Sequence, residues 1–387
     1  MAKILYVMGI RIPDEVRAEK VCRALVKDGH EVTVLSRWFD GAPEREVYQG
    51  VTILRAGKHL PFWRSNPLSV NPFWQKEILV AARETGAQLL ITREMLIAEA
   101  SARVGQKLGI PALIDMAENY PGAMRGWKKY QSKFILRLLV NTIKIPDVIE
   151  KRAVQSSDGI IIVCDEQVER LHQAYGMAKD NMVLVQNTPE LELYEDVTKT
   201  CAAPPNVFAH HGYFTLDRGL EALVRGFMIT AEEFADTSLL LAGIGETYRE
   251  VKAIAESTAL RGRISFPGEF KLTSRAALYS QIDVGIMPYA ADENFNFTIP
   301  NKLFDYMACG KPVIVSEAVP MKRVVEETGA GIVADCSSPD KIADAIRKMR
   351  GADVAKMSEN GRKAAEKKYN WAVDSERLCK FVRKFIA

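Results

Sequence analysis

The sequence has few of the residues and patterns from which a metal site is built. Its six cysteines and five histidines are scattered over 387 residues, with no C-x-x-C pair and no H-x-x-x-H. Zinc-type ligand spacing is therefore absent, and we expect no protein-bound metal and no resident cofactor. Free thiols in this arrangement are typical of the reducing cytoplasm.

Long apolar runs are missing as well. No uninterrupted stretch reaches the length of a membrane-spanning helix. The N-terminal apolar run is interrupted by Arg11 and then by Pro-Asp-Glu, too early for a signal peptide. We therefore expect a cytoplasmic location.

Charge of one sign is also scarce. The chain has 52 Lys and Arg against 49 Asp and Glu, a formal net charge of +3. A nucleic-acid-binding protein usually shows a larger basic excess on one face, so we expect no nucleic-acid partner. The length favours two domains, and 48% hydrophobic with 26% charged residues is ordinary for a globular protein.

What the sequence does contain is an alternation of short apolar runs and amphipathic segments. KILYVMG at 3–9 ends in glycine, helix-spaced apolar residues follow, and EVTVLS at 31–36 is a second apolar run. Continuous apolar runs are typical of parallel strands that are covered on both faces. Further strand candidates of the first half are 88–92, 111–116, 159–164 and 181–187.

A polar, proline-bearing stretch at 187–206 interrupts this pattern, and we interpret it as a domain linker. The alternation then restarts. Strand candidates of the second half are 206–214, 237–245, 263–270, 283–289, 311–316 and 331–335. The sequence therefore predicts an α/β protein with two doubly wound parallel-sheet domains.

Glycine-rich motifs of the second half resemble those of a known family. They are HHGYFTLDRGLEAL (210–223), LLLAGIGE (239–246), RISFPGEF (263–270) and PNKLFDYMACGKPVIVS (300–316), and they occur in the family's order. On these motifs the chain resembles the retaining GT-B glycosyltransferases of group 1, the glycosyltransferase family 4-like superfamily, in its P-x-K-x-x-[DE] branch.

The resemblance implies a GT-B fold, in which two Rossmann-like doubly wound parallel-sheet domains face each other across a cleft. It implies an acceptor-binding domain at 1–190, a nucleotide-sugar donor domain at 205–365 and a C-terminal helix at 366–387 that crosses back to the first domain. The first half carries the resemblance more loosely than the second.

The segment 300–316 has the features of a phosphate-binding helix start. Unpartnered N–H groups and the positive end of the helix dipole attract anions. Pro300 suits the first helical turn, Lys302 adds a positive charge there, Asp305 follows one turn later, and Gly310 is placed to end the helix. The alternative is an exposed Lys302–Asp305 pair worth a few tenths of a kcal/mol.

The resemblance implies the roles of the donor-site residues. Arg218 and Lys302 would stabilise the negative charge that develops on the leaving diphosphate, and Asp305 would contact the ribose. The full donor-binding set is Gly212, Tyr213, Arg218, Gly243, Gly268, Phe270, Thr298, Lys302 and Asp305. Two positions depart from the family: Tyr213 stands where many relatives carry a second arginine, and Phe297 where many carry a glutamate.

On the acceptor side, Glu118 in IDMAENYPG follows a strand, at the end where ligands of α/β sheets bind. The resemblance makes it a candidate catalytic and acceptor-facing acid; a helix N-cap or a surface acid is the alternative. Asp115 is interpreted as structural. Arg11, Trp63 and Trp74 are the other expected acceptor contacts, although aromatics of the loop at 59–77 could equally pack on the domain.

The segment at 125–144 combines basic residues with Trp127, Phe134 and leucines. Such a basic amphipathic segment can lie on an anionic membrane surface, and peripheral association with the inner face of the cytoplasmic membrane is one expectation. The alternative is a surface helix whose apolar side belongs to the core.

These features predict a glycosyltransferase that moves a sugar from a nucleotide-sugar donor, with a UDP-sugar expected, to a glycan or lipid-linked acceptor with retention of configuration. A role in cell-envelope or surface polysaccharide synthesis is expected. The alternatives are a non-catalytic nucleotide-sugar-binding GT-B protein and a GT-B nucleotide-sugar epimerase. A Rossmann oxidoreductase is disfavoured because no G-x-G-x-x-G follows the first strand.

Overall fold

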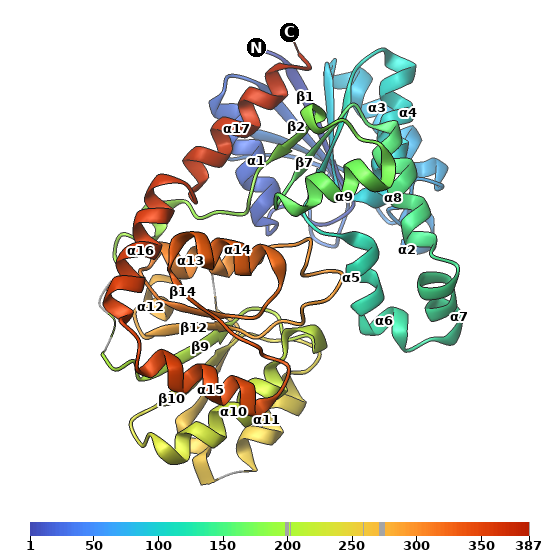
Figure 1. The fold of residues 1–387 in the computed structure, drawn as a ribbon. Coiled ribbons are helices and arrows are strands. Elements are labelled where there is room, and N and C mark those ends of the chain that lie inside the picture. Colours follow the sequence, from blue (N-terminus) through green and yellow to red (C-terminus); the bar gives the residue numbers. More distant parts are fainter. Residues whose placement is uncertain (198–200, 202, 258, 271–274, 387) are drawn as a thin grey trace. The chain divides into compact units, whose positions relative to one another are not determined.

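A computed structural model describes residues 1–197, 201, 203–257, 259–270 and 275–386 (Figure 1). The chain separates into two compact units: unit 1 contains Met1–Val185 and Asp374–Ala387, and unit 2 contains Gln186–Val373. Each unit is an α/β domain with a parallel sheet at its centre, as the alternating pattern predicts.

The sheet of unit 1 has the order β3-β4-β2-β1-β5-β6-β7-β8 among the described residues. Its strands are β1 (Lys3–Met8), β2 (Glu31–Arg37), β3 (Arg45–Tyr48), β4 (Val51–Ala56), β5 (Leu89–Arg93), β6 (Ala112–Met116), β7 (Gly159–Ile162) and β8 (Met182–Leu184). Neighbouring strands are parallel except β3 and β4, which form an antiparallel pair at the edge. The strand order reverses direction between β1 and β5.

Helices cover both faces of this sheet. The helices of this unit are α1 (Val16–Lys27), α2 (Phe62–Ser65), α3 (Pro72–Thr85), α4 (Ala98–Leu108), α5 (Tyr120–Gly126), α6 (Lys128–Gln131), α7 (Phe134–Arg137), α8 (Ile145–Ser156), α9 (Glu166–Tyr175) and α17 (Trp371–Arg383), of which α6 and α7 have no buried residue. The helices α1 and α17 lie on one face, and α3, α4 and α8 lie on the other (Figure 1). Every residue of β5 and β6 is buried, which explains why these strands are continuous apolar runs.

Unit 2 repeats the plan with the order β11-β10-β9-β12-β13-β14. Its strands are β9 (Val207–His211), β10 (Ser238–Ala242), β11 (Ile264–Gly268), β12 (Val284–Met287), β13 (Val313–Val315) and β14 (Gly331–Val333). Its helices are α10 (Leu220–Glu233), α11 (Tyr248–Glu256), α12 (Arg275–Tyr279), α13 (Asn301–Ala308), α14 (Val319–Thr328), α15 (Pro339–Arg350) and α16 (Val354–Lys367). All of its strand pairs are parallel, and the order reverses between β9 and β12.

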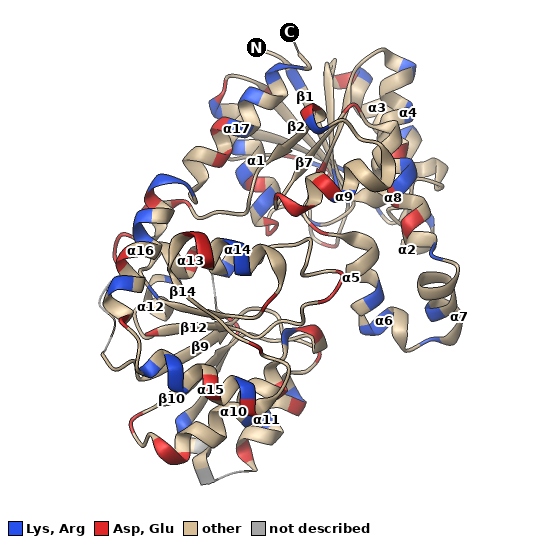
Figure 2. Cartoon of the chain, in the orientation of Figure 1, with Lys and Arg blue, Asp and Glu red and all other residues tan. Residues whose placement is uncertain are grey.

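In unit 2, α10, α11 and α15 lie on one face of the sheet, and α13 and α14 lie on the other (Figure 1). Phe208, Leu223, Phe227 and Ile346 are fully buried between the sheet and its helices. Charged residues lie mainly on helices and loops, while the strands are mostly free of them (Figure 2). The interior is thus apolar, and the polar chemistry lies at the ends of the strands.

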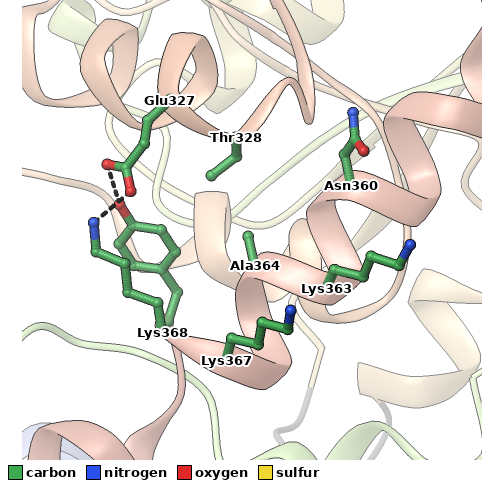
Figure 3. Close-up of a pocket in the computed structure, with 8 residues that line it drawn as sticks. Glu327, Thr328, Asn360, Lys363, Ala364, Lys367 and Lys368 are labelled. Atoms are coloured by element: carbon green, nitrogen blue, oxygen red, sulfur yellow. Dashed lines mark hydrogen bonds and ion pairs between the residues drawn. The ribbon is translucent and has the colours of Figure 1, made fainter.

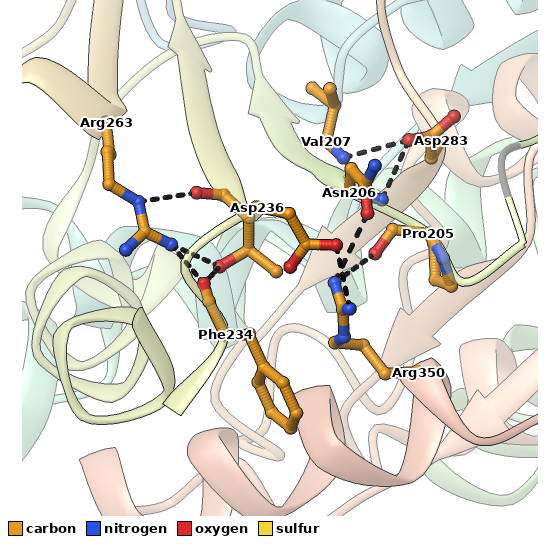
Figure 4. A network of polar contacts seen from close by, with 9 residues as sticks. Pro205, Asn206, Val207, Phe234, Asp236, Arg263, Asp283 and Arg350 are labelled. Carbon is orange, nitrogen blue, oxygen red and sulfur yellow. Dashed lines mark hydrogen bonds and ion pairs between the residues drawn. The ribbon is translucent and has the colours of Figure 1, made fainter. Parts of the chain in front are cut away.

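Two arginines form hydrogen bonds with backbone carbonyls near the amino ends of the strands in unit 2 (Figure 4). Arg263 donates from Nε to the Thr237 carbonyl at 2.7 Å, and Arg350 donates to the Pro205 carbonyl at 3.1 Å. The Asp283 carboxylate accepts from the backbone N–H groups of residues 206 and 207 at 2.9 Å each. These contacts stabilise the edge opposite to the one where ligands of α/β sheets bind.

The stretch 187–206, expected as a linker, carries a short 3-10 helix at Leu191–Tyr194. Tyr194 is buried in unit 2. Residues 198–200 and 202 of this stretch lie outside the described part. Within that part, no helix combines the length and apolarity needed to cross a membrane.

Candidate functional site

Two glycine-containing turns of unit 2 pack backbone against backbone at the carboxyl ends of β9 and β10. The Gly212 N–H donates to the Ala242 carbonyl and the Phe214 N–H to the Ile244 carbonyl, both at 2.8 Å. Gly212 has φ 117° and Gly243 φ 144°, values that side chains rarely tolerate. A Cβ on Gly243 would lie 1.9 Å from the Gly212 carbonyl oxygen. This contact therefore requires glycine, as the family motif implied.

Lys302 lies beneath the first of these turns. Its Nζ is 2.8 Å from the point that a Cβ on Gly212 would occupy and 3.4 Å from His210 Nε2. Nδ1 of His210 is 2.8 Å from the Ile286 carbonyl, to which it can only donate. Nε2 of the neutral ring is then an acceptor for the Lys302 amine.

The helix start around Lys302 differs in two ways from expectation. Pro300 is the N-cap of α13 with extended backbone (ψ 134°), so it precedes the first helical turn instead of lying within it. Lys302 and Asp305 are 9% and 4% exposed, which excludes the alternative of an exposed surface pair. Gly310 ends the helix as predicted: it has φ 64°, and the Lys311 N–H donates to the Tyr306 carbonyl.

Burial, followed by repulsion from Arg218, holds the pKa of the Lys302 amine well below its ordinary value. Burial and the nearby Lys302 likewise hold the pKa values of His210 and His211 well below the usual range. The neighbourhood therefore disfavours further positive charge and favours an anion. It also lies between β9 and β12, where the strand order reverses and where doubly wound sheets bind ligands.

Arg218 ends a short 3-10 helix, Leu216–Arg218, directly before α10. Its guanidinium carbon lies 4.5 Å from the centre of the Tyr289 ring and 4.9 Å from that of Phe295. The next residue, Gly219, has φ 66°, and a Cβ there would lie 2.2 Å from the Pro288 carbonyl oxygen. Arg218 is therefore held beside the end of β12 by aromatic stacking.

Asp305 is part of a buried polar cluster. Its Oδ1 accepts from the Tyr194 hydroxyl at 2.9 Å, and its Oδ2 is 4.0 Å from Arg275. Arg275 also donates to the Tyr194 hydroxyl at 3.3 Å. The sequence motif predicted that Asp305 belongs to the donor site. It did not predict its partners Tyr194 and Arg275, because both lie far from Asp305 along the chain.

The remaining predicted donor residues lie at strand ends and in loops of unit 2. The Phe270 ring is edge-on to His211 at 5.5 Å between ring centres, and Tyr213 is 59% exposed. Gly268 has φ 79° with open space where a Cβ would stand. The Thr298 hydroxyl donates to the Asn294 side-chain oxygen at 3.4 Å.

The loop before α13 lacks a free acid in place of the family glutamate. The Asp292 carboxylate accepts from the backbone N–H groups of Asn294 and Phe295 at 2.9 Å each, so it caps the loop. His210 and Tyr289 were missed by sequence reasoning. The pair of histidines immediately before Gly212 was the available signal.

In unit 1, Glu118 lies between β6 and α5 and is half-buried. The N-cap of α5 is Asn119, whose side-chain oxygen accepts from the Gly122 N–H at 3.5 Å, so the N-cap alternative for Glu118 is wrong. Asp115 is structural, as interpreted: it is fully buried, 2.6 Å from Arg17, and accepts from the Tyr6 hydroxyl at 2.7 Å. Arg17 lowers the pKa of Asp115 against the opposing effect of burial.

The expected acceptor contacts differ in their exposure. Trp74 is fully buried, and its indole N–H donates to the Ser65 carbonyl at 3.2 Å. The expectation that Trp74 contacts an acceptor is corrected, because its ring packs in the core and has no surface left for a ligand. Trp63 is 71% exposed, and Arg11 is exposed with its guanidinium 4.5 Å from the Phe39 ring centre.

The segment at 125–144 is broken into α6, α7 and a π-helical turn at Leu138–Thr142, instead of one amphipathic helix. Phe134 and Ile135 are 70% and 67% exposed. The alternative that its apolar side belongs to the core is therefore wrong for these residues.

A cavity of about 270 Å³ lies elsewhere in unit 2, between α14 and α16 (Figure 3). Lys363 and Lys367 line it, and Lys368 is already paired with Glu327 there. None of the predicted donor residues is part of its lining, so this cavity gives no support to the donor site. No cluster of His, Cys, Asp and Glu suited to a metal occurs in the residues that the structure describes.

Comparison with known proteins places this geometry in context. Residues 15–188 match the family model described as Glycosyl transferase 4-like domain, and residues 205–350 match the one described as Glycosyl transferases group 1. Phosphatidyl-myo-inositol mannosyltransferase of Mycobacterium leprae is 25% identical over 199 residues, which cover 51% of this chain and 50% of that protein. The chain thus spans about half the length of this relative.

Solved structures resemble the chain over nearly its whole length. Sucrose-phosphate synthase from Thermosynechococcus elongatus has a TM-score of 0.77 at 18% identity and covers 99% of both chains. Anabaena HepE, solved in complex with UDP-glucose, has a TM-score of 0.71 at 15% identity and covers 99% of this chain and 100% of its own. These similarities confirm the predicted class of fold.

Proposed function

The chain belongs to the GT-B superfamily of group 1, glycosyltransferase 4-like enzymes, and from this premise we propose that it transfers a sugar from a nucleotide-sugar donor, with UDP-sugar as the donor class, to a glycan or lipid-linked acceptor with retention of configuration. The observation that carries the proposal is the cationic cradle of unit 2, where Lys302 lies beneath Gly212 and Arg218 stands beside the end of β12. A solved relative of the same fold was obtained with UDP-glucose.

The proposed chemistry follows from the charges of this cradle. Departure of the nucleotide leaves negative charge on its diphosphate, and preorganised cations in a water-poor site stabilise that charge. Lys302, Arg218 and the N–H groups at the start of α13 would supply this stabilisation without a protein-bound metal. Asp305, held by Tyr194, would accept hydrogen bonds from the ribose hydroxyls.

Glu118 is proposed as the acid of unit 1 that faces the transferred sugar, with Arg11 and Trp63 as acceptor contacts. A role in cell-envelope or surface polysaccharide synthesis suits a lipid-linked acceptor. The donor-binding features alone would also suit a binding protein without activity or an epimerase, so donor binding and product formation are tested separately.

The experiment is a thermal-shift panel of nucleotide sugars, each compared with its free nucleotide. A donor at a hundred times its Kd stabilises the fold by about 2.7 kcal/mol. Arg218→Ala should reduce the shift, whereas Arg225→Ala, an exposed arginine of α10 that pairs with Glu221, should not. Absence of any nucleotide effect on the wild-type protein would refute the proposal.

Product analysis then separates the alternatives. A transferase consumes little donor until an acceptor is added, whereas an epimerase converts the donor alone. A protein that binds the donor and glycosylates no acceptor from the host's lipid and glycan pools would be the binding protein. Anomeric configuration of the product, read by proton NMR, tests retention.

We also propose membrane contact through 125–144, independently of the donor proposal. Exposed Phe134 and Ile135 lie beside Lys133 and Arg137, so apolar insertion and attraction to anionic lipid would act together. Co-sedimentation with phosphatidylglycerol vesicles at low salt should be lost in Phe134→Asp and kept in Val47→Asp, which alters an equally exposed apolar residue of β3. No co-sedimentation by the wild-type protein would refute membrane contact and leave the donor proposal standing.

A further inference from the structure

Glu94 lies at the place in unit 1 where ligands of doubly wound sheets bind. The chain runs from β1 to β2 and β4 on one side of the sheet and from β5 to β8 on the other, so the strand order reverses between β1 and β5. Ligands bind outside the carboxyl ends of the strands at such a reversal. β5 ends at Arg93, which is paired with Met8 at the end of β1, and Glu94 follows directly.

The backbone of Glu94 is held in a conformation that side chains rarely adopt. Its φ is 85° and its ψ 143°, a combination that is comfortable only for glycine. The Glu94 N–H donates to the Asp115 carbonyl at 3.4 Å, and the Arg93 guanidinium donates to the same carbonyl. Strain of this kind persists where the surroundings enforce it, and it is concentrated at ligand sites.

No contact of the Glu94 side chain within the described part of the protein offsets this backbone strain. It is half-buried, and its carboxylate forms no hydrogen bond or ion pair with any described residue. The neighbouring cation Arg93 is already engaged by Glu15 at 3.3 Å. The ammonium group of Lys129 on α6 lies 4.6 Å from the centre of the Trp127 ring.

Both acids and cations surround Glu94. Glu15 precedes α1, Glu118 follows β6, and the buried Tyr120 begins α5; with Arg93 and Lys129 they are the ionisable groups that act on Glu94. Burial raises the pKa of Glu94 to about 7 against the lowering effect of Arg93, and repulsion from Glu15 and Glu118 adds to the rise. Added negative charge is therefore unfavourable here, while a neutral hydrogen-bonding group is not.

We propose that Glu94 is a specificity-determining residue of the acceptor site, where it binds an uncharged hydroxyl of the acceptor and excludes a phosphate group. The inference rests on the proposed glycosyl transfer and adds the chemistry of the acceptor at this position. A hydroxyl can donate to the ionised carboxylate and can accept from the protonated carboxyl. A phosphate would instead be repelled by the ionised Glu94 carboxylate, which has no ion-pair partner among the described residues.

The test uses the full chain and small probes. Methyl α-D-glucopyranoside and myo-inositol serve as neutral probes, D-glucose 6-phosphate as the charged one, and binding is measured by saturation-transfer NMR in the presence of UDP. Glu94→Gly suits the local backbone and removes the carboxyl. It should keep or raise the melting temperature and weaken neutral-probe binding at least tenfold.

Glu94→Gln keeps the shape and removes the charge. It should raise the affinity for glucose 6-phosphate relative to the neutral probes at least threefold. Glu84→Ala, an exposed acid on α3 of the same unit, should change neither.

Three results would each overturn the assignment: equal neutral-probe binding by wild type and Glu94→Gly, an unchanged ratio in Glu94→Gln, or no neutral-probe binding by the wild type. The UDP-induced thermal shift separates this failure from failure of the proposed function. If UDP stabilises every variant while the probes do not discriminate, only the assignment of Glu94 fails. If UDP stabilises none of them, the donor proposal fails.

Discussion

Replacing Lys302 by methionine should change stability and nucleotide affinity in opposite directions. Lys302 is 9% exposed, its pKa is depressed mainly by burial, and Arg218 adds repulsion. Burying an amine costs free energy, as its depressed pKa shows, and an apolar side chain of similar length avoids this cost. We therefore expect Lys302→Met without ligand to be at least as stable as the wild type in urea denaturation.

The same substitution removes a cation from the proposed diphosphate site. A hydrogen bond to a charged group contributes about 1.5–3 kcal/mol, and about 1.4 kcal/mol is tenfold in Kd. The Kd for UDP, measured by titration calorimetry, should therefore rise about 10- to 100-fold. Lys311→Met is the control, because Lys311 is also buried in unit 2 but lies near Asp283, at the amino ends of the strands.

Protonation gives an independent readout of the same prediction. The native pKa of Lys302 is depressed, so between that pKa and about 10.5 the unfolded chain binds more protons than the folded one. Stability should rise with pH in this window, and UDP binding should take up a proton if the amine becomes charged. The reasoning would be refuted if Lys302→Met were less stable than the wild type and bound UDP equally well.

Three further predictions address single features. Gly243→Ala should cost about 3 kcal/mol or more in urea denaturation, because the new Cβ would overlap the Gly212 carbonyl, whereas Gly262→Ala, with open space around it, should be nearly neutral. Asp305→Asn should weaken UDP about tenfold and leave pyrophosphate binding unchanged, since its carboxylate is proposed to serve the ribose. The pKa of Glu94 is raised from 4.5 to about 7, so ionisation of its carboxyl destabilises the fold. The melting temperature of the wild type should therefore fall from pH 5 to 8, and that of Glu94→Gln should fall less.

Local patterns predicted most strands of both sheets but missed β3 and β4 at the edge of the first sheet. Continuous apolar runs correspond to β1, β2, β5 and β6, because strands covered on both faces carry no alternation. The turn glycines at 212 and 243 were predictable as well, since only glycine allows such close backbone contact.

Features that depend on tertiary packing were not predictable. Trp74 resembles an exposed loop aromatic in sequence, yet it is buried because α3 packs on the sheet. Tyr194 belongs to a stretch that resembles a linker, but its hydroxyl meets Asp305, which lies far along the chain. The strain at Glu94 leaves no sequence signal, because the residue that occupies the position is not the one its backbone prefers.

The helix α17 also determines when unit 1 can be completed during synthesis. Its Cys379 thiol lies 3.8 Å from the Ala24 carbonyl, Arg383 pairs with Asp28, and Phe381 and Phe385 lie against Gly159. These partners are made early on the ribosome, whereas α17 emerges only after the whole of unit 2. The surface that α17 covers on unit 1 must therefore stay uncovered while unit 2, a single continuous segment, is translated. A nascent chain stalled before residue 374 would therefore leave this surface exposed.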